Sequence, residues 1–111
     1  MTFDETKAGD ILVLTVKAER VTADVAPAFK QGLAEYVAQG NQKIVLDLGQ
    51  VSFIDSSGLG VLISVLKLIG GSGELVLSNL HHTVAGMFKL TRMNKVFRIF
   101  DNRDEAIAAL A

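Results

Sequence analysis

The hydrophobic positions at the start of the chain are those of strands. Residues Ile11–Val16 are apolar and rich in β-branched side chains, and the triplet Ala8-Gly9-Asp10 separates them from Thr2–Thr6. β-branched side chains are enriched in strands, and a short segment containing glycine often joins two strands of a hairpin. The pattern therefore predicts a strand or a hairpin opening here.

From Asp24 onward the spacing changes to that of a helix. Apolar side chains recur at every fourth position with polar residues between them, at Val25, Phe29, Leu33 and Val37. Asp24 is the predicted N-cap, which places Pro27 in the first turn, where its missing N–H group removes no intrahelical bond. Gly40 lies where such a helix commonly ends.

A strand, a helix and a second strand are predicted next. The nearly continuous apolar run Lys43–Leu48 is typical of a central strand that is covered on both faces. Between Ser57 and Ile69 the polar or small residues fall three or four apart on an otherwise apolar helix, which must be largely covered. Glycines end this helix before the short apolar strand Glu74–Ser78. The order predicts a βαβ unit with parallel strands and a right-handed crossover.

The last third of the chain predicts three more elements. After Asn79, apolar residues at helical spacing indicate a helix, at Leu80, Val84, Met87 and Phe88. Val96–Phe100 is the predicted last strand, and Asp101–Leu110 the closing helix. Asp101 is its predicted N-cap, and Asp104 lies near the positive end of the helix dipole.

Composition narrows the classes of function. A chain of 111 residues, half of them hydrophobic and 21% charged, is expected to form one domain over residues 1–111. A formal net charge of -1 gives no broad field that would attract nucleic acid or anionic lipid. The absence of cysteine excludes disulfides, thiolate metal sites and a cysteine nucleophile.

The distribution of polar and apolar residues also predicts the cellular location of the protein. The first ten residues, MTFDETKAGD, are polar and acidic rather than basic and then apolar, so no secretory signal is expected. The longest apolar stretch, Gly58–Gly71, is interrupted by Ser64 and Lys67 and is too short to span a bilayer. We therefore expect a cytoplasmic protein without membrane insertion.

One polar cluster stands between two apolar runs, in the sequence FIDSSGLG. If Ser57 opens the helix, Asp55 and Ser56 lie in the loop beyond the carboxyl end of the sheet, where α/β proteins gather functional groups. The free N–H groups of a helix start can hold a phosphate or accept a capping oxygen. Gly58 and Gly60 are expected to leave the backbone open to a partner surface. Helix capping alone also explains the cluster.

Catalytic interpretations have weaker support. Neither Ser56 nor Ser57 lies in a GxSxG motif, and the only histidines available as a base are His81 and His82, which are better explained as an exposed helix start. The phosphate-binding motif GxxxxGK[ST] is absent. We expect no enzymatic activity, no cofactor and no metal.

Two other sets of charged residues are better explained by structural roles. Asp47 and Asp55 could act as paired carboxylates, but no second catalytic set accompanies them. A loose basic segment is typical of a solvated face and is poor evidence for nucleic acid, at Lys89, Arg92, Lys95 and Arg98.

The chain resembles the STAS domain family, and within it the small single-domain anti-sigma factor antagonists. The resemblance rests on Ile44–Leu48 followed by Val51–Leu62, and it extends through Ala26-Pro27-Ala28, Leu90-Thr91, Lys95-Val96-Phe97 and Asp104-Glu105-Ala106. It implies an α/β fold of STAS type, with a mixed β-sheet of four to five strands flanked by about four α-helices.

The resemblance also implies a function and a site. Ser56, immediately after the aspartate, matches the serine that an anti-sigma factor with a serine kinase domain phosphorylates and a serine phosphatase restores. The unmodified antagonist would bind the anti-sigma factor and release a sigma factor. We expect the partner surface to comprise seven residues: Thr22, Asp55, Ser56, Ser57, Gly58, Leu59 and Gly60. Whether the chain forms a dimer stays open.

Two alternatives accompany this prediction. The domain could be a constitutive STAS subunit of a lipid-transport ATPase or of a signalling scaffold, with Ser56 a structural helix cap. The second alternative is a small hydrolase that uses Ser56 or Ser57. One position departs from the family pattern: many members have Gly-x-Leu-Asp before the first helix, whereas this chain has Glu19–Thr22, so that Thr22 replaces the loop aspartate.

Overall fold

Seven strands, four α-helices and one 3₁₀ helix make up the fold. The computed structural model describes all residues, 1–111. The strands are β1 (Phe3–Ala8), β2 (Ile11–Val16), β3 (Arg20–Val21), β4 (Lys43–Asp47), β5 (Phe53–Ile54), β6 (Glu74–Ser78) and β7 (Ile99–Phe100). The helices are α1 (Ala26–Ala38), α2 (Ser56–Ile69), α3 (His82–Leu90), the 3₁₀ helix Met93–Lys95, and α4 (Arg103–Leu110).

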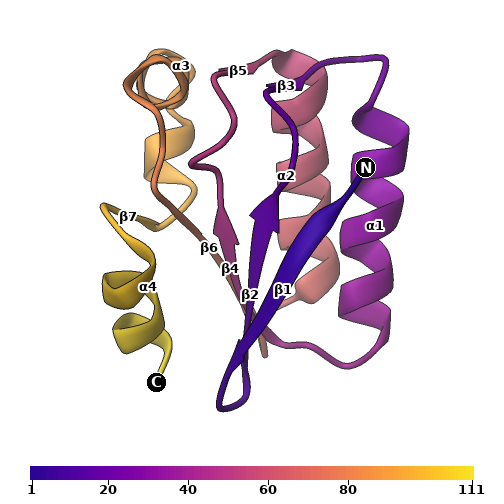
Figure 1. Ribbon diagram of the computed structural model, residues 1–111, viewed down its shortest axis with the longest axis vertical. Coiled ribbons are helices and arrows are strands. Elements are labelled where there is room, and N and C mark those ends of the chain that lie inside the picture. Colours follow the sequence, from indigo (N-terminus) through magenta and orange to yellow (C-terminus); the bar gives the residue numbers. More distant parts are fainter.

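The main sheet is mixed and has five strands in the order β1-β2-β4-β6-β7. β1 pairs antiparallel with β2 as a hairpin, and β2, β4, β6 and β7 are parallel. All the parallel strands therefore end at one edge of the sheet, the upper edge in Figure 1. This arrangement confirms the predicted fold class, the opening hairpin and the parallel pairing of β4 with β6.

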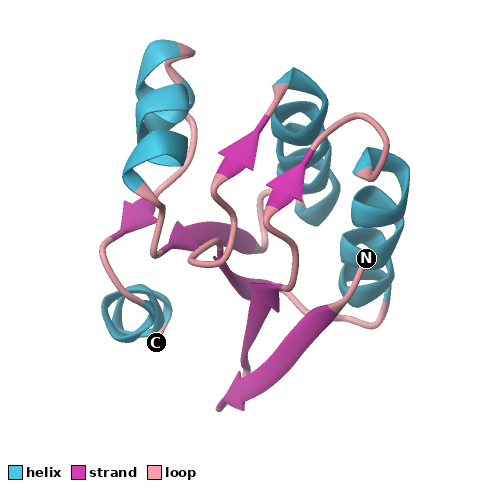
Figure 2. Cartoon of the chain, turned by 45° about the horizontal axis from the view of Figure 1, so that its top comes forward, coloured by secondary structure: helices cyan, strands magenta, loops and turns pink.

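The two faces of the sheet bury alternate residues of the same strands. Leu12, Leu14, Ile44 and Leu46 belong to a core of 22 buried residues under α1, α2 and α3. The residues between them face α4, in a smaller cluster formed by Ile11, Val13, Val45, Val76, Ala106 and Leu110. Figure 2 shows α4 on one side of the sheet and the other three helices on the opposite side. No helix has both the length and the apolar character needed to cross a bilayer.

A second, two-stranded sheet was not predicted. β3 and β5 pair in parallel through Arg20 with Phe53 and Val21 with Ile54. Each strand has two residues, which is too short for a periodic signal in the sequence. The pair brings together the loops that precede α1 and α2, which are far apart in the chain.

Two predicted helix caps are wrong. α1 has Val25 as its N-cap, without a side-chain cap bond, because the carboxylate of Asp24 accepts the hydroxyl of Thr22 instead. α4 has Asn102 as its N-cap, and the side chain of Asn102 accepts the N–H of Glu105 at 2.9 Å. Asp101 lies one residue too early in the bend that follows β7.

The predicted last strand is too long. Only Ile99 and Phe100 form β7, because the backbone from Met93 onward turns: the N–H groups of Val96 and Phe97 both donate to the carbonyl of Met93. Phe97 enters the main core and packs edge-on against Phe88, with ring centroids 6.0 Å apart. The turn thus places the Phe97 ring in the core, and the strand propensity of this segment does not determine its backbone.

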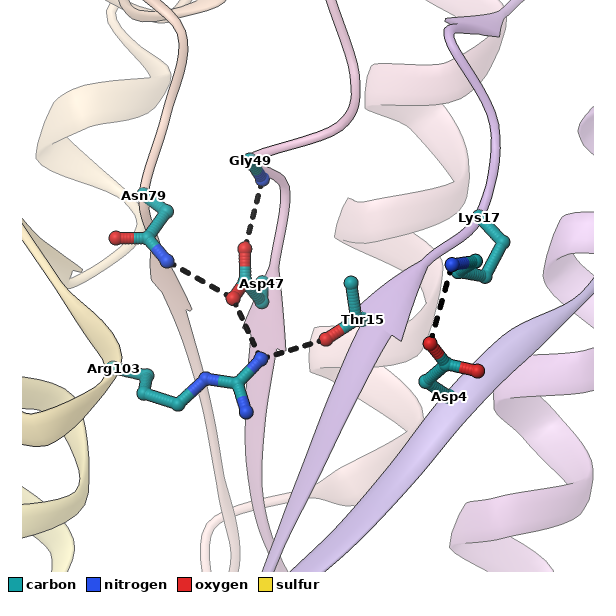
Figure 3. Close-up of polar contacts among 7 residues, drawn as sticks. All are labelled: Asp4, Thr15, Lys17, Asp47, Gly49, Asn79 and Arg103. Carbon is teal, nitrogen blue, oxygen red and sulfur yellow. Dashed lines mark hydrogen bonds and ion pairs between the residues drawn. The ribbon is translucent and has the colours of Figure 1, made fainter.

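A buried carboxylate joins the ends of three strands to α4. Asp47 is 5% exposed and accepts hydrogen bonds from the Gly49 N–H at 2.8 Å, the Asn79 amide at 2.9 Å and the Arg103 guanidinium at 2.9 Å. The guanidinium also donates to the Thr15 hydroxyl at 2.8 Å. Figure 3 shows Thr15, Asp47 and Asn79, which come from β2, the end of β4 and the residue after β6, around this one arginine. Asp47 is therefore a structural residue.

The first prediction concerns this network. Replacing Arg103 with Met leaves a buried carboxylate with only neutral donors, so the free energy of unfolding should fall by about 1.5 to 3 kcal/mol. Lys17→Met is the matched control, since the Lys17–Asp4 pair at 3.3 Å is largely exposed, and exposed pairs contribute about 0.2 to 1 kcal/mol. Urea denaturation measures both, and equal losses would contradict the structural role of Asp47.

Candidate functional site

The β3–β5 pair positions the predicted site. β3 leads into the loop that contains Thr22, and β5 leads directly into Asp55 and α2. The Asp55 N–H donates to the carbonyl of Val21 at 3.2 Å, which extends the pairing by one residue. Figure 1 shows β3, β5 and the start of α2 together at the upper edge of the molecule. The structure thus brings Thr22 next to Asp55, as the predicted site requires.

The Asp55 carboxylate uses its two oxygens for two different segments. Oδ1 accepts the N–H of Gly58 at 3.0 Å, which caps α2. Oδ2 accepts the N–H of Ala23 at 3.1 Å, in the loop before α1. One half-buried side chain therefore fixes the relative position of both loops.

Ser56 is the first residue of α2 rather than a loop residue or its cap. It is exposed, Ser57 is half-buried, and Asp55 fills the capping position. The N–H groups of the first two helical residues, Ser56 and Ser57, have no intrahelical partner. The alternative role of Ser56 as a structural cap is therefore wrong, and the residue is exposed.

The glycines that follow have different roles. A Cβ at Gly58 would lie 2.6 Å from Ile54 Cγ1 and 2.8 Å from the Val21 carbonyl oxygen, so Gly58 lets α2 approach the β3–β5 pair closely. It is buried, and its expected access from outside is wrong. A Cβ at Gly60 meets nothing within 4 Å, and that position is exposed. Leu59 is 6% exposed and packs in the main core.

The loop that contains Thr22 still presents a carboxylate. The Thr22 hydroxyl donates to Asp24 Oδ1, and this hydrogen bond is the main reason that the pKa of Asp24 lies below its ordinary value. Asp24 is exposed, so the loop carries an ionised side chain two residues after the position where the family aspartate is missing.

The residues considered for catalysis do not lie together in one site. His81 and His82 are exposed at the start of α3 and line a shallow polar hollow with Gly49 and Asp101, whereas Ser56 belongs to α2. The carboxylates of Asp47 and Asp55 bind different segments and share no hydrogen bond. No group of three or more histidine, aspartate or glutamate side chains is placed to hold a metal ion.

The fold and the site define a small α/β protein whose distinguishing feature is an exposed helix start at the carboxyl edge of the sheet. The sequence model of the STAS domain matches residues 3–106, and the chain belongs to the STAS domain family.

Similar proteins include bacterial regulators. A Thermotoga maritima protein named as an anti-sigma factor antagonist is 31% identical over 103 residues, which cover 91% of each chain. The anti-sigma-B factor antagonist of Listeria monocytogenes is 32% identical over 83 residues, 74% of this chain and 73% of its own. A crystal structure of a T. maritima protein of the same name superposes with a TM-score of 0.87 at 28% identity, covering 96% of this chain and 92% of that one.

The second prediction tests the double role of Asp55. Asp55→Ala removes the α2 cap and the acceptor for the Ala23 N–H, so the free energy of unfolding should fall by about 1 to 3 kcal/mol. Asp101→Ala, an exposed acidic residue that caps no helix, should stay within about 0.5 kcal/mol of the native chain. The measurement is urea denaturation, and a loss at Asp101 equal to that at Asp55 would refute the assignment.

The third prediction concerns the loop before α1. Thr22→Val removes the hydroxyl that stabilises the ionised form of Asp24, so the pKa of Asp24 should rise toward its ordinary value, while Thr22→Ser should keep it low. Because the folded-state pKa is lowered, this bond stabilises the fold at neutral pH and its contribution is lost as the pH falls through that pKa. Carboxyl NMR titration measures the shift, and identical titration of the valine and serine variants would exclude this cause.

Proposed function

We propose that this chain is a phosphorylation-switched anti-sigma factor antagonist. With Ser56 unmodified, it binds an anti-sigma factor that is also a serine kinase, and the sigma factor is released. Phosphorylation of Ser56 ends the complex, and a serine phosphatase restores it. The protein acts in the cytoplasm as a binding module and not as an enzyme.

The exposure of Ser56 is the observation that carries this proposal. A kinase needs a hydroxyl that reaches solvent and whose modification leaves the fold intact. Ser56 meets both conditions, because it is exposed at the first position of α2 and because Asp55, not Ser56, provides the cap. The names of the relatives from T. maritima and L. monocytogenes support the same role.

The electrostatics of the site explain how one phosphate could switch binding. A phosphoserine carries about -1.5 to -2 charges at neutral pH. The partial positive charge and free N–H groups of the α2 start tolerate this charge, so the fold persists. The carboxylates of Asp55 and Asp24 lie in the two adjoining loops, and a partner docked on them faces a strongly anionic surface after phosphorylation. Like charges brought together at an interface cost several kcal/mol.

The partner surface consists of the exposed part of the predicted set. Ser56 and Gly60 are exposed and Thr22, Asp55 and Ser57 are half-buried, so these five positions can touch a partner directly. Gly58 and Leu59 are buried and support the helix start from below. Asp24 supplies the loop carboxylate in place of the family aspartate that Thr22 replaces.

The fourth prediction tests the switch. Ser56→Asp should weaken binding to the cognate anti-sigma kinase about tenfold or more, a change of about 1.4 kcal/mol or greater, and Ser56→Ala should bind like the native chain. Calorimetry with the recombinant kinase measures affinity, and mass spectrometry after incubation with ATP locates the phosphate.

The adjacent hydroxyl provides the control. Ser57→Ala should still accept phosphate at residue 56, and Ser56→Ala should accept none. Native affinity of Ser56→Asp together with no phosphate on Ser56 would refute the switch. Recovery of a transporter ATPase as a permanent partner, regardless of Ser56, would favour the constitutive subunit instead.

A further inference from the structure

An apolar groove lies beside the predicted partner surface and is not part of it. Phe53 and Ile54 of β5 form one wall, and Thr83, Gly86, Met87 and Leu90 form a stripe along α3 on the other. Its volume is about 200 Å³. Small-molecule sites measure roughly 300 to 1,000 Å³, so this groove matches one or two protein side chains better than a metabolite. We call it the α3 groove.

Part of the apolar surface in the α3 groove is not covered by any other part of the chain. Leu90, one of its lining residues, is 83% exposed. Gly86 stands in the middle of α3, where glycine lowers helix stability by roughly 0.5 to 1 kcal/mol relative to alanine. A Cβ there would meet nothing within 4 Å, so packing within the chain does not require glycine. Its missing side chain does keep the groove open.

The segment of the chain that supplies the α3 wall of the groove is basic. No aspartate or glutamate occurs between Leu75 and Phe100, and this stretch carries four cations: Lys89, Arg92, Lys95 and Arg98. Arg98 is paired with Glu74 at 2.7 Å, and the other three form no ion pair. On the opposite wall, the Arg20 guanidinium lies 4.5 Å above the centre of the Phe53 ring. Since the whole chain has a net charge of -1, this segment is basic in a chain whose remainder is acidic.

We infer that the α3 groove receives a short acidic segment of the anti-sigma factor, anchored by one large apolar side chain. The inference rests on the proposed function, because the same partner would cover both areas. The groove is continuous with the predicted partner surface: β5 supplies Phe53 and Ile54 to the groove, and the next two residues are Asp55 and Ser56. Figure 1 shows α3 and the start of α2 at the same upper edge, on either side of β5.

A membrane surface fits the same residues less well. The apolar side chains line a concave groove, whereas insertion into a bilayer requires a protruding apolar face. Buried apolar anchors surrounded by polar contacts are typical of protein interfaces. Two anchoring areas also give the partner a contact that does not depend on the charge state of Ser56.

The fifth prediction uses two Lys-Leu pairs as matched sites. Lys67 and Leu68 lie in the last turn of α2. Lys89 and Leu90 are the last two residues of α3, and all four side chains are exposed. Leu90→Asp should weaken binding to the recombinant anti-sigma kinase about tenfold or more, and Leu68→Asp should change it less than about twofold. Lys89→Glu should reduce affinity and its dependence on salt, and Lys67→Glu should change neither.

A groove-filling variant separates binding from folding. Gly86→Leu places a side chain into open space and replaces glycine with a good helix former, so its urea midpoint should rise while its affinity for the kinase falls about tenfold. Native affinity of both Gly86→Leu and Leu90→Asp would overturn the groove assignment.

The two proposals fail in different ways. If Ser56→Asp weakens the complex but the groove variants bind normally, the switch stands and the groove assignment falls. If the groove variants alone weaken it, the switch falls. A chain that binds no anti-sigma factor overturns both. Binding of the native chain to vesicles of phosphatidylglycerol and phosphatidylcholine that Leu90→Asp abolishes would assign the groove to a membrane surface instead.

Discussion

The two oxygens of Asp55 fix the geometry on which the proposed switch depends. One caps α2 at Gly58 and the other holds the loop before α1 at Ala23, so a single side chain joins the helix start to the neighbouring loop. Because the aspartate does this structural work, the hydroxyl of the next residue stays free. In the proposed switch, the cap and the modified hydroxyl lie on adjacent residues, so phosphorylation would change the binding surface without removing the cap.

Most of the fold could be predicted because its signals are local. The apolar run of β4 and the spacing of Val25, Phe29 and Leu33 each identify an element within one window of sequence. The parallel pairing of β4 with β6 followed from the helix between them. The cap errors at Asp24 and Asp101 have another origin. The Asp24 carboxylate binds the Thr22 hydroxyl instead of a helix N–H group, and the side chain of Asn102 takes the capping position predicted for Asp101. The sequence does not show which of these competing hydrogen bonds forms.

The features that could not be predicted depend on contacts between distant residues. β3 and β5 are two residues each and exist as strands only because they meet. The closeness of Thr22 to Asp55 follows from that pair, and the resemblance to the family anticipated it where spacing alone could not. The role of Asp47 was missed for the same reason, since Arg103, its charged partner, is 56 residues away. The α3 groove requires β5 beside α3, and no periodicity in either segment encodes that.

The position of α4 has a consequence for the newly synthesised chain. Only the last helix covers the second face of the sheet, through Ala106 and Leu110, and Arg103 reaches back 88 residues to Thr15. Until residues 103–110 fold back onto the sheet, Val13, Val45 and Val76 have no covering layer and form an exposed apolar face. Chaperone binding before α4 packs should therefore concentrate there, on the side of the sheet opposite to α2.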